Sequence, residues 1–406
     1  MNYSKLCDSL VIEYKYPGVE EGWIISQRSY SKGTLIMLSD EAIQEALEYC
    51  KIPKEMHSAF YRASKIIKNN DALERLFWHC INEVFVLRRN AAPVKMIPRL
   101  DRVMGEDTAM FRALLILSGV PFLKNSHRQR NIPDRYTRLA FRDITIWMKD
   151  YYRNYNSWGL DAVGWLLNPF RRRLFRIGRL EFIPSSFDHP IMILKHRENN
   201  DMKVMIDRSI EFRGDGYING VNGIYDAQGA WLSDCIITEQ TICGNIIDEL
   251  GRACREPVLI NRKEYEIVLD NYSLVLDVHI PEDGTLDKKA CQESYSEALS
   301  FFYKYYPDEN IKGFKCTSWL LDSGLIPLLP EESNILLFQN EYMLFPTLGG
   351  EAQTLERVFR IKPFEIDKAP QVSRLQKSLL SHLKNGEHFH SEGGILLSNT
   401  VMKWNE

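Results

Sequence analysis

The spacing of apolar residues changes once along the chain, near residue 170. Before that point apolar residues recur at intervals of three and four, which is typical of helices with one buried face. Asn70 or Asp71 can cap the clearest of these helices, whose apolar stripe consists of Leu73, Leu76, Phe77, Cys80, Ile81, Val84 and Phe85. We expect further helices around residues 40–50, 56–68, 106–118 and 135–152. The pattern predicts an all-helical N-terminal domain over residues 1–170.

After residue 170 the pattern becomes that of strands. β-Branched and aromatic residues alternate with arginine in "LFRIGRLEFIPSS", and further strands are expected in "HPIMILKHRE", "DMKVMIDRSIEFR" and "GDGYINGVNG". The stretch "QTICGNIIDELGRA" is expected to interrupt them as a loop or a short helix. Polar and Gly-rich turns between short strands indicate an antiparallel sheet.

A strand, a helix and a second strand then follow in "NYSLVLDVHIP", "LDKKACQESYSEALSFFYKYY" and "GFKCTSWLLD". Such a unit normally makes two parallel strands with a right-handed crossover. A second helical segment is expected in "GLIPLLPEESNILLFQNEY". We therefore predict an α+β fold, in which residues 171–406 form a mixed-sheet domain with flanking helices.

Length and composition are typical of a soluble protein with two domains. The 406 residues are 45% hydrophobic and 26% charged. The first residues do not have the pattern of a secretory leader, and no segment is apolar for long enough to cross a membrane. The eight cysteines include no C-x-x-C pair, which argues against a zinc ribbon or a disulfide framework. We expect a cytoplasmic protein without a membrane partner.

Charge is distributed unevenly, although the net charge is only -3. Residues 121–180 carry thirteen Lys and Arg against four Asp, a local excess of nine positive charges. We call this segment the basic belt. It can attract the phosphates of a cofactor, or it can simply be a solvated face. It carries no nucleic-acid-binding motif, so a nucleic-acid partner is not expected.

A carboxylate and a histidine share one face of the strand "SLVLDVHIP". Asp277 and His279 are two residues apart, about 7 Å along a strand, and point the same way. The carboxylate can orient the imidazole or raise its basicity, as a general base requires. The alternative is a histidine that only hydrogen-bonds a neighbouring loop.

The next strand offers a thiol and a hydroxyl. Cys316 and Ser318 share one of its faces, and if the two strands are neighbours they can approach the face of Asp277 and His279. A thiol nucleophile, Cys316 with His279, is the least favoured possibility, because an apolar strand does not stabilise a thiolate.

The turn after "DVHIP" leads into a helix that begins near Lys288. Thr285 or Asp287 can cap this helix, and the exposed amides and positive dipole end at its start can bind an anion. The acids Glu282 and Asp283 in the turn oppose that binding. "HFHSEGG" near the C-terminus could present His388, His390 and Glu392 together, but such runs arise by chance, and we expect no metal site.

The stretches "LFRIGRLEF", "DVHIP", "CTSWLLD" and "LLPEESNILLF" resemble those of a bacterial two-domain N-acyltransferase family. In that family a helical N-terminal domain precedes a GNAT-like C-terminal domain, a relative of the acetyl-CoA-dependent N-acetyltransferases. The resemblance implies that the strands ending near His279 and Ser318 splay apart, with the pantetheine of an acyl-CoA between them.

The resemblance also assigns roles to residues. His279 or Asp277 would be the base, and Ser318 or Tyr295 the acid that protonates the departing thiolate. The cofactor pyrophosphate would lie against the turn and helix start, at Ile280, Asp283, Gly284, Thr285, Leu286 and Lys288. This turn departs from the family pattern in having a single glycine and several acids.

Three functions remain open from the sequence, and the least favoured is a thiol-dependent hydrolase or transferase that uses Cys316. The first is an acyl-CoA-dependent N-acyltransferase, with acetyl-CoA or another acyl-CoA as donor, acetyl being the expected group, and a small-molecule amine as acceptor. The second is a catalytically silent GNAT-like binding or regulatory protein. The sequence leaves the acceptor, the acyl length and the oligomeric state undetermined.

Overall fold

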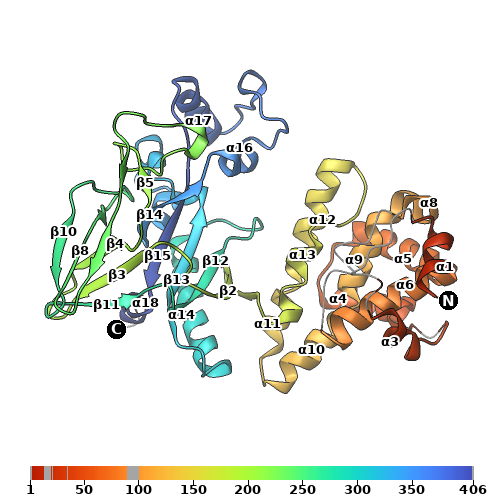
Figure 1. Cartoon of the computed structure of the whole chain (residues 1–406). Helices are drawn as coiled ribbons and strands as arrows, with labels where there is room; N and C mark the ends of the chain where they lie inside the picture. The colour runs from red at the N-terminus through yellow and green to blue at the C-terminus, as the bar shows by residue number, and fades with distance from the viewer. Residues whose placement is uncertain (1, 13–19, 21, 34, 89–99, 405–406) are drawn as a thin grey trace. The chain divides into compact units, whose positions relative to one another are not determined.

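A computed structural model describes residues 2–12, 20, 22–33, 35–88 and 100–404. Contacts divide the chain into two compact units, coloured from red to blue along the chain in Figure 1. The helical unit comprises residues 1–177 together with 281–283, and the sheet unit comprises residues 178–280 and 284–406. The short segment 281–283 thus belongs to the helical unit, although the sequence around it belongs to the sheet unit.

The described part of the helical unit is almost entirely α-helical, as predicted. Four of the expected helices correspond to α4, α5, α9 and α12. The elements are α1 (Tyr3–Leu10), α3 (Trp23–Arg28), α4 (Asp40–Tyr49), α5 (Lys54–Lys68), α6 (Asp71–Ile81), α8 (Asp101–Met104), α9 (Met110–Leu117), α10 (Val120–Gln129), α11 (Asp134–Leu139), α12 (Arg142–Tyr155) and α13 (Val163–Leu166), followed by the strand β1 (Phe175–Ile177).

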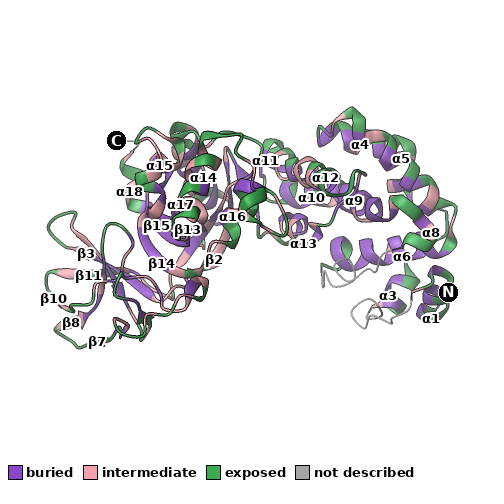
Figure 2. Ribbon diagram, turned by 90° about the horizontal axis from the view of Figure 1, so that it is seen from above, coloured by how far each residue is buried: buried purple, intermediate pink, exposed green. Residues whose placement is uncertain are grey.

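Helix α6 shows how local sequence sets these elements. The side chain of Asn70 accepts hydrogen bonds from the amides of Ala72 and Leu73, which satisfies two donors at the helix start. The predicted apolar stripe is buried, and Phe77 meets Phe111 of α9 edge to face at 5.3 Å between ring centroids. A π-helical turn over Asn82–Val86 continues α6. The buried faces of these helices form one core, purple in Figure 2.

The sheet unit is built around a mixed sheet in the order β2-β12-β13-β15-β14. Strand β12 pairs in parallel with β13 through the crossover helix α14, which confirms the predicted strand–helix–strand unit. The other neighbours are antiparallel. The bounds are β2 (Leu180–Ser186), β12 (Leu274–His279), α14 (Lys288–Tyr305), β13 (Ile311–Ser318), α15 (Asn334–Gln339), β14 (Met343–Gly349), α16 (Ala352–Phe359), α17 (Arg374–Lys384), β15 (Ser391–Leu397) and α18 (Ser398–Lys403).

Smaller sheets lie between β2 and β12 in the sequence. One has the order β11-β3-β4-β9, the next β10-β8-β7, and a third pairs β5 with β6. Their bounds are β3 (Ile191–His196), β4 (Met202–Ile206), β5 (Glu211–Phe212), β6 (Trp231–Leu232), β7 (Cys235–Ile237), β8 (Thr241–Gly244), β9 (Ile246–Ile247), β10 (Val258–Asn261) and β11 (Tyr265–Leu269).

Two local predictions in this region were wrong. "GDGYINGVNG" forms turns instead of a strand, because Gly216, Gly220 and Gly223 have positive φ angles and Asn222 is left-handed as well. "QTICGNIIDELGRA" contains strands β8 and β9 rather than a loop or helix, since Ile242 and Ile247 are buried in sheet contacts.

The two faces of the mixed sheet are covered differently. On one face Val275, Phe345 and Ile395 share a core with residues of β3, β4 and β9. On the other face α14 packs through Tyr295, whose ring lies 6.2 Å from that of Phe182 and 4.9 Å from that of Phe314. Within the described residues, no helix has both the length and the apolar character needed to span a bilayer.

Candidate active site

The parallel strands β12 and β13 stop pairing before either strand ends. Their register runs from Leu274 opposite Ile311 to Asp277 opposite Lys315. Strand β12 continues to His279 alongside β2, and β13 continues to Ser318 alongside β15. We call this end of the two strands the strand opening. Backbone groups that face it are not used by the β12–β13 ladder, so a ligand's amide groups can bond to them.

Asp277 and His279 lie together at the strand opening, as the alternation predicted. The Nε2 atom of His279 is 3.7 Å from Oδ2 of Asp277, and both side chains are about one-third exposed or less. Burial raises the pKa of Asp277, while His279 and Lys315 act in the opposite direction. A carboxylate at this distance can hold the imidazole in one orientation.

Two more polar side chains from the neighbouring strand share this face. Because Lys315 is the register partner of Asp277, alternation places Lys315 and Thr317 on the Asp277 face. The ammonium of Lys315 is buried and lies 2.6 Å from Oδ1 of Asp188, in the loop after β2. An isolated buried ammonium would be costly, and this ion pair stabilises it.

A second histidine, His189, completes the polar face and was missed from the sequence. Its Nε2 atom lies 3.5 Å from the hydroxyl of Thr317, and its ring centroid lies 4.8 Å from that of Phe345. Burial, reinforced by Lys315, lowers the pKa of His189 to about 4. The imidazole is therefore neutral near pH 7 and can accept a proton. In the sequence it stands at the start of a strand-like run, and no local pattern distinguishes it.

The predicted acid and thiol candidates face the other way, which corrects the expected approach. Cys316 and Ser318 point to the α14 side of the sheet, opposite Asp277 and His279, because they alternate with Lys315 and Thr317. Burial raises the pKa of the Cys316 thiol, and Ser318 accepts a hydrogen bond from the amide of Leu320. Tyr295 is fully buried and shares a 2.6 Å hydroxyl hydrogen bond with Tyr342.

An arginine that directly precedes β2 contacts the predicted phosphate-binding turn. The Arg179 guanidinium donates to the carbonyl oxygens of Gly284 and Thr285, each at 2.7 Å. Asp287, not Thr285, caps α14 by accepting from the amide of Ala290 at 2.9 Å. The ammonium of Lys288 lies 3.5 Å from Glu341. The guanidinium of Arg179 therefore places a positive charge beside the start of α14, in addition to that of Lys288.

The two acids of the turn are neutralised within the helical unit. Glu282 pairs with Arg153 at 3.1 Å, and Asp283 pairs with Arg176 at 2.6 Å and with Arg142 at 3.5 Å. Arg176 is buried and also bonds Asp143. These acids are therefore less repulsive to a phosphate than the sequence suggested.

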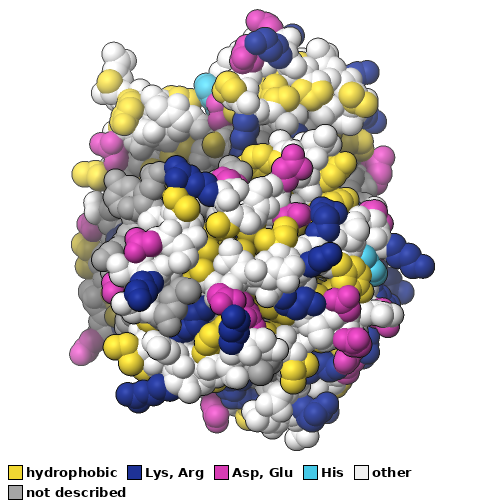
Figure 3. All heavy atoms as spheres, turned by 90° about the vertical axis from the view of Figure 1, so that its right-hand side faces the viewer, with side chains coloured by type: hydrophobic (Ala, Val, Ile, Leu, Met, Phe, Trp, Pro, Cys, Tyr) yellow, Lys and Arg dark blue, Asp and Glu magenta, His cyan; other side chains and the backbone are white. Residues whose placement is uncertain are grey.

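The same ion pairs bear on the two interpretations of the basic belt. At least five of its basic residues contact acids, so much of the positive charge is offset internally: Lys124, Arg138, Arg142, Arg153 and Arg176. On the molecular face drawn in Figure 3, blue and magenta side chains are interspersed, without a large patch of one sign.

The C-terminal histidines do not meet as a cluster. His388 pairs with Glu351 at 2.9 Å, the ring of His390 stacks on Tyr217 at 3.7 Å, and Glu392 bonds Arg252. Across residues 2–404, apart from the gaps stated above, no group of three or more His, Cys, Asp or Glu is arranged to hold a metal ion.

Two family descriptions match consecutive segments of the chain. An N-acyltransferase N-terminal domain matches residues 41–172, and a GNAT-like C-terminal domain matches residues 174–396, more than half of the sequence. The chain belongs to the two-domain N-acyltransferases. These matches confirm the resemblance noted from the sequence and the predicted α+β fold. They also confirm the prediction that the protein is an enzyme. The strand opening and the turn before α14 lie in its GNAT-like domain.

Solved acyltransferase structures share the fold of this N-acyltransferase. One is an acyltransferase mutant in complex with octanoyl-CoA, at 20% identity and a TM-score of 0.64. Another is an acyltransferase in complex with decanoyl-CoA and teicoplanin, at 20% identity and a TM-score of 0.63. Each alignment covers 98% of this chain and 99% of the other. No curated protein matches the sequence.

Proposed function

We propose that this N-acyltransferase moves a medium-length acyl group from acyl-CoA to an amino group of a small molecule. The observation that carries the proposal is the strand opening, where Asp277, His279 and His189 share one face. The neighbours of the same fold hold octanoyl-CoA, or decanoyl-CoA with teicoplanin. The proposal therefore replaces acetyl, the group expected from the sequence, with a chain of eight to ten carbons.

In this proposal the donor lies along the β12–β13 opening. Its pantetheine amides would bond the backbone groups of β12 and β13 that lie beyond the end of their ladder. Its pyrophosphate would lie at the start of α14. Backbone amides from Ile280 to Leu286, the helix dipole and Arg179 would supply the positive potential. Arg176 and Lys288 already have acidic partners: Arg176 neutralises Asp283, and Lys288 lies near Glu341.

Acyl transfer then requires attack by the acceptor nitrogen on the thioester carbon. A C–N bond forms, the C–S bond breaks, and the nitrogen loses a proton while the thiolate leaves. His279, oriented by Asp277, is one proposed proton acceptor, and neutral His189 beside Thr317 is the other. A weak base is sufficient to accept this proton, because the nitrogen becomes strongly acidic once it has attacked the thioester carbon. Ser318, the acid candidate expected from the sequence, has a side chain that faces away from both histidines.

The proposal is tested by release of free CoA thiol from decanoyl-CoA in the presence of a panel of primary amines. We expect amine-dependent release by the wild type and loss of about 10²- to 10⁴-fold in kcat when the base is replaced. His279→Gln, Asp277→Asn and His189→Gln, tested singly, identify which histidine is the base. Binding of CoA without any amine-dependent release would instead support the catalytically silent alternative.

A further inference from the structure

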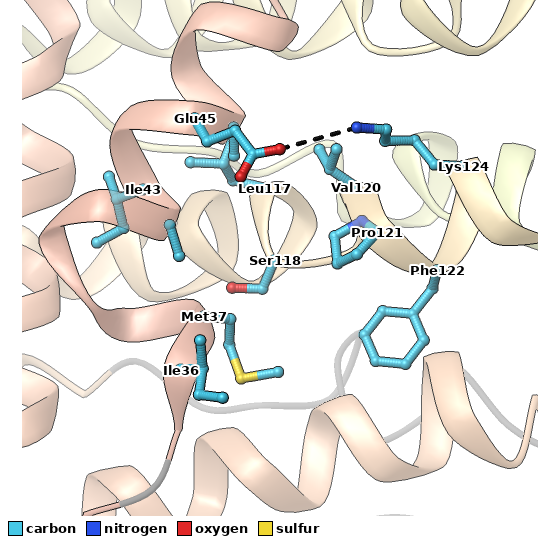
Figure 4. Close-up of a pocket in the computed structure, with 12 residues that line it drawn as sticks. Ile36, Met37, Ile43, Glu45, Leu117, Ser118, Val120, Pro121, Phe122 and Lys124 are labelled. Atoms are coloured by element: carbon cyan, nitrogen blue, oxygen red, sulfur yellow. Dashed lines mark ion pairs between the residues drawn. The ribbon is translucent and has the colours of Figure 1, made fainter. Parts of the chain in front are cut away.

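The helical unit contains an apolar cavity, separate from the strand opening. It has a volume of about 260 Å³ and lies between α4, the short 3-10 helix Ile36–Leu38, and the junction of α9 with α10 (Figure 4). Nine of its lining residues are apolar: Ile36, Met37, Ala42, Ile43, Ala46, Leu117, Val120, Pro121 and Phe122. Ile43 and Leu117 are almost fully buried, whereas Ile36 is 78% exposed, so the cavity has an apolar floor and an apolar rim.

The two charged residues of this cavity lie at one of its ends. Figure 4 shows Glu45 and Lys124 at that end and Ile36, Met37 and Phe122 at the other. The ammonium of Lys124 is 3.8 Å from Glu45 and 4.5 Å from the ring centroid of Tyr49. The Glu45 side chain is 79% exposed, so this ion pair is weak and a second anion can compete for Lys124.

The third polar residue does not add a binding group to the interior. The hydroxyl of Ser118 donates to the carbonyl of Leu114 at 2.9 Å, so its donor is already used. The cavity therefore offers an apolar interior and one cation at its mouth. That arrangement fits an alkyl chain with an oxygen-bearing end.

We propose that this cavity binds an unbranched alkyl chain of about eight to ten carbons, with its acyl oxygen end near Lys124. An apolar cavity of about 150 Å³ takes up a six-carbon ring, so by proportion about 260 Å³ accommodates roughly ten carbons. Met37 is flexible and can adjust to chains of slightly different length. The occupant that we infer is a free fatty acid, whose carboxylate would lie near Lys124.

The primary test is equilibrium binding of hexanoate, octanoate, decanoate and dodecanoate to the full chain by titration calorimetry. Each buried methylene contributes about 0.8 kcal/mol, so the Kd falls about fourfold per methylene. We expect this fall to continue to about ten carbons and then flatten. A Kd that does not depend on chain length, or no binding of decanoate, would overturn the proposal.

Filling the cavity provides the specific variant. Ala46→Phe places a ring in the interior and is expected to weaken decanoate binding at least about tenfold, through loss of two or more buried methylenes. The matched control is Gln44→Phe, at an exposed position of the same helix that does not line the cavity. If Ala46→Phe does not fold, Ala42→Leu is the milder variant. Equal binding by the variant and the control would contradict the site.

Enzyme kinetics provide a second control. Ala46→Phe is expected to weaken decanoate binding while the KM for decanoyl-CoA and for acetyl-CoA stays unchanged. The decanoate titration does not need turnover, so failure of the proposed function, seen as no thiol release by the wild type, is distinct from failure of the cavity proposal.

Discussion

The two faces of β12 and β13 at the strand opening differ in chemistry although they belong to the same strands. The face toward the smaller sheets carries Asp277, His279, Lys315 and Thr317, with His189 beside them. The face toward α14 carries Cys316 and Ser318, and α14 contributes the buried Tyr295 to that side. Charged and imidazole groups lie on the first face, whereas the second holds a thiol and a phenol whose pKa values are raised by burial.

This difference shows that adjacent residues of one strand face opposite sides of the sheet and therefore meet different chemical surroundings. Cys316 is adjacent to both Lys315 and Thr317, but only those two share the face of His279. A nucleophile on the α14 side would not face His279 or His189. The comparison therefore predicts where substitutions reduce catalysis and where they do not.

The largest effect is expected on the histidine face. The double variant His189→Gln/His279→Gln removes both proposed proton acceptors and is expected to lower kcat for decanoyl-CoA by about 10²- to 10⁴-fold. Thiol release at saturating donor and amine measures it, and circular dichroism checks that the variant is folded. Wild-type turnover by the folded double variant would remove this face from the mechanism.

Arg179 tests the turn that joins this opening to α14. Arg179→Met removes two hydrogen bonds between a charged donor and the turn, and each such bond contributes about 1.5–3 kcal/mol. Because the turn is then held less firmly, the KM for acyl-CoA is expected to rise about tenfold or more. The kcat should change little, because Arg179 does not contact the proposed bases. Arg197→Met is the control, since Arg197 is an exposed arginine paired with Glu266 elsewhere in the sheet unit. An unchanged KM would show that the turn does not hold the donor.

Lys315 tests the electrostatics of the histidine face through pH. With a pKa of about 4, His189 is unprotonated at higher pH, so a mechanism that uses it keeps its rate down to about pH 4 and loses it below. Lys315→Met removes one cause of the lowered pKa, although burial, the larger cause, remains. The acid limb of kcat/KM should therefore move to higher pH in the variant. A limb that stays in place would exclude His189 as the group that titrates.

The smallest effects are expected on the α14 face. Ser318→Ala and Cys316→Ala should keep kcat within about threefold of wild type, because neither side chain faces the histidines. Iodoacetamide should leave activity intact, since Cys316 is buried and burial raises the pKa of its thiol. A hundredfold loss in Ser318→Ala would place an acid on this face and break the comparison.

Sequence was sufficient where the cause of structure is local. Asp287 caps α14 and Asn70 caps α6, each within three residues of the amides it binds. Strict alternation put Asp277 and His279 on one face because a strand has a period of two. The anion site proposed at the turn and helix start also rests on neighbouring residues alone.

Contacts between distant residues could not be predicted in this way. Which face Ser318 occupies relative to His279 depends on the register of β12 against β13, which contains an irregularity between Leu274 and Val275. His189 reaches Thr317 across 128 residues, and Arg153 reaches Glu282 across 129. A one-residue shift in register would have reversed the faces, and nothing in either strand's own sequence fixes it.

Hydrogen–deuterium exchange of the full chain, with and without saturating CoA, tests the central claim most directly. The account predicts slower exchange of backbone amides in residues 278–288 and 315–319, with β7, β8 and β10 unchanged. Protection confined to other segments, with none at the strand opening or the turn before α14, would contradict it.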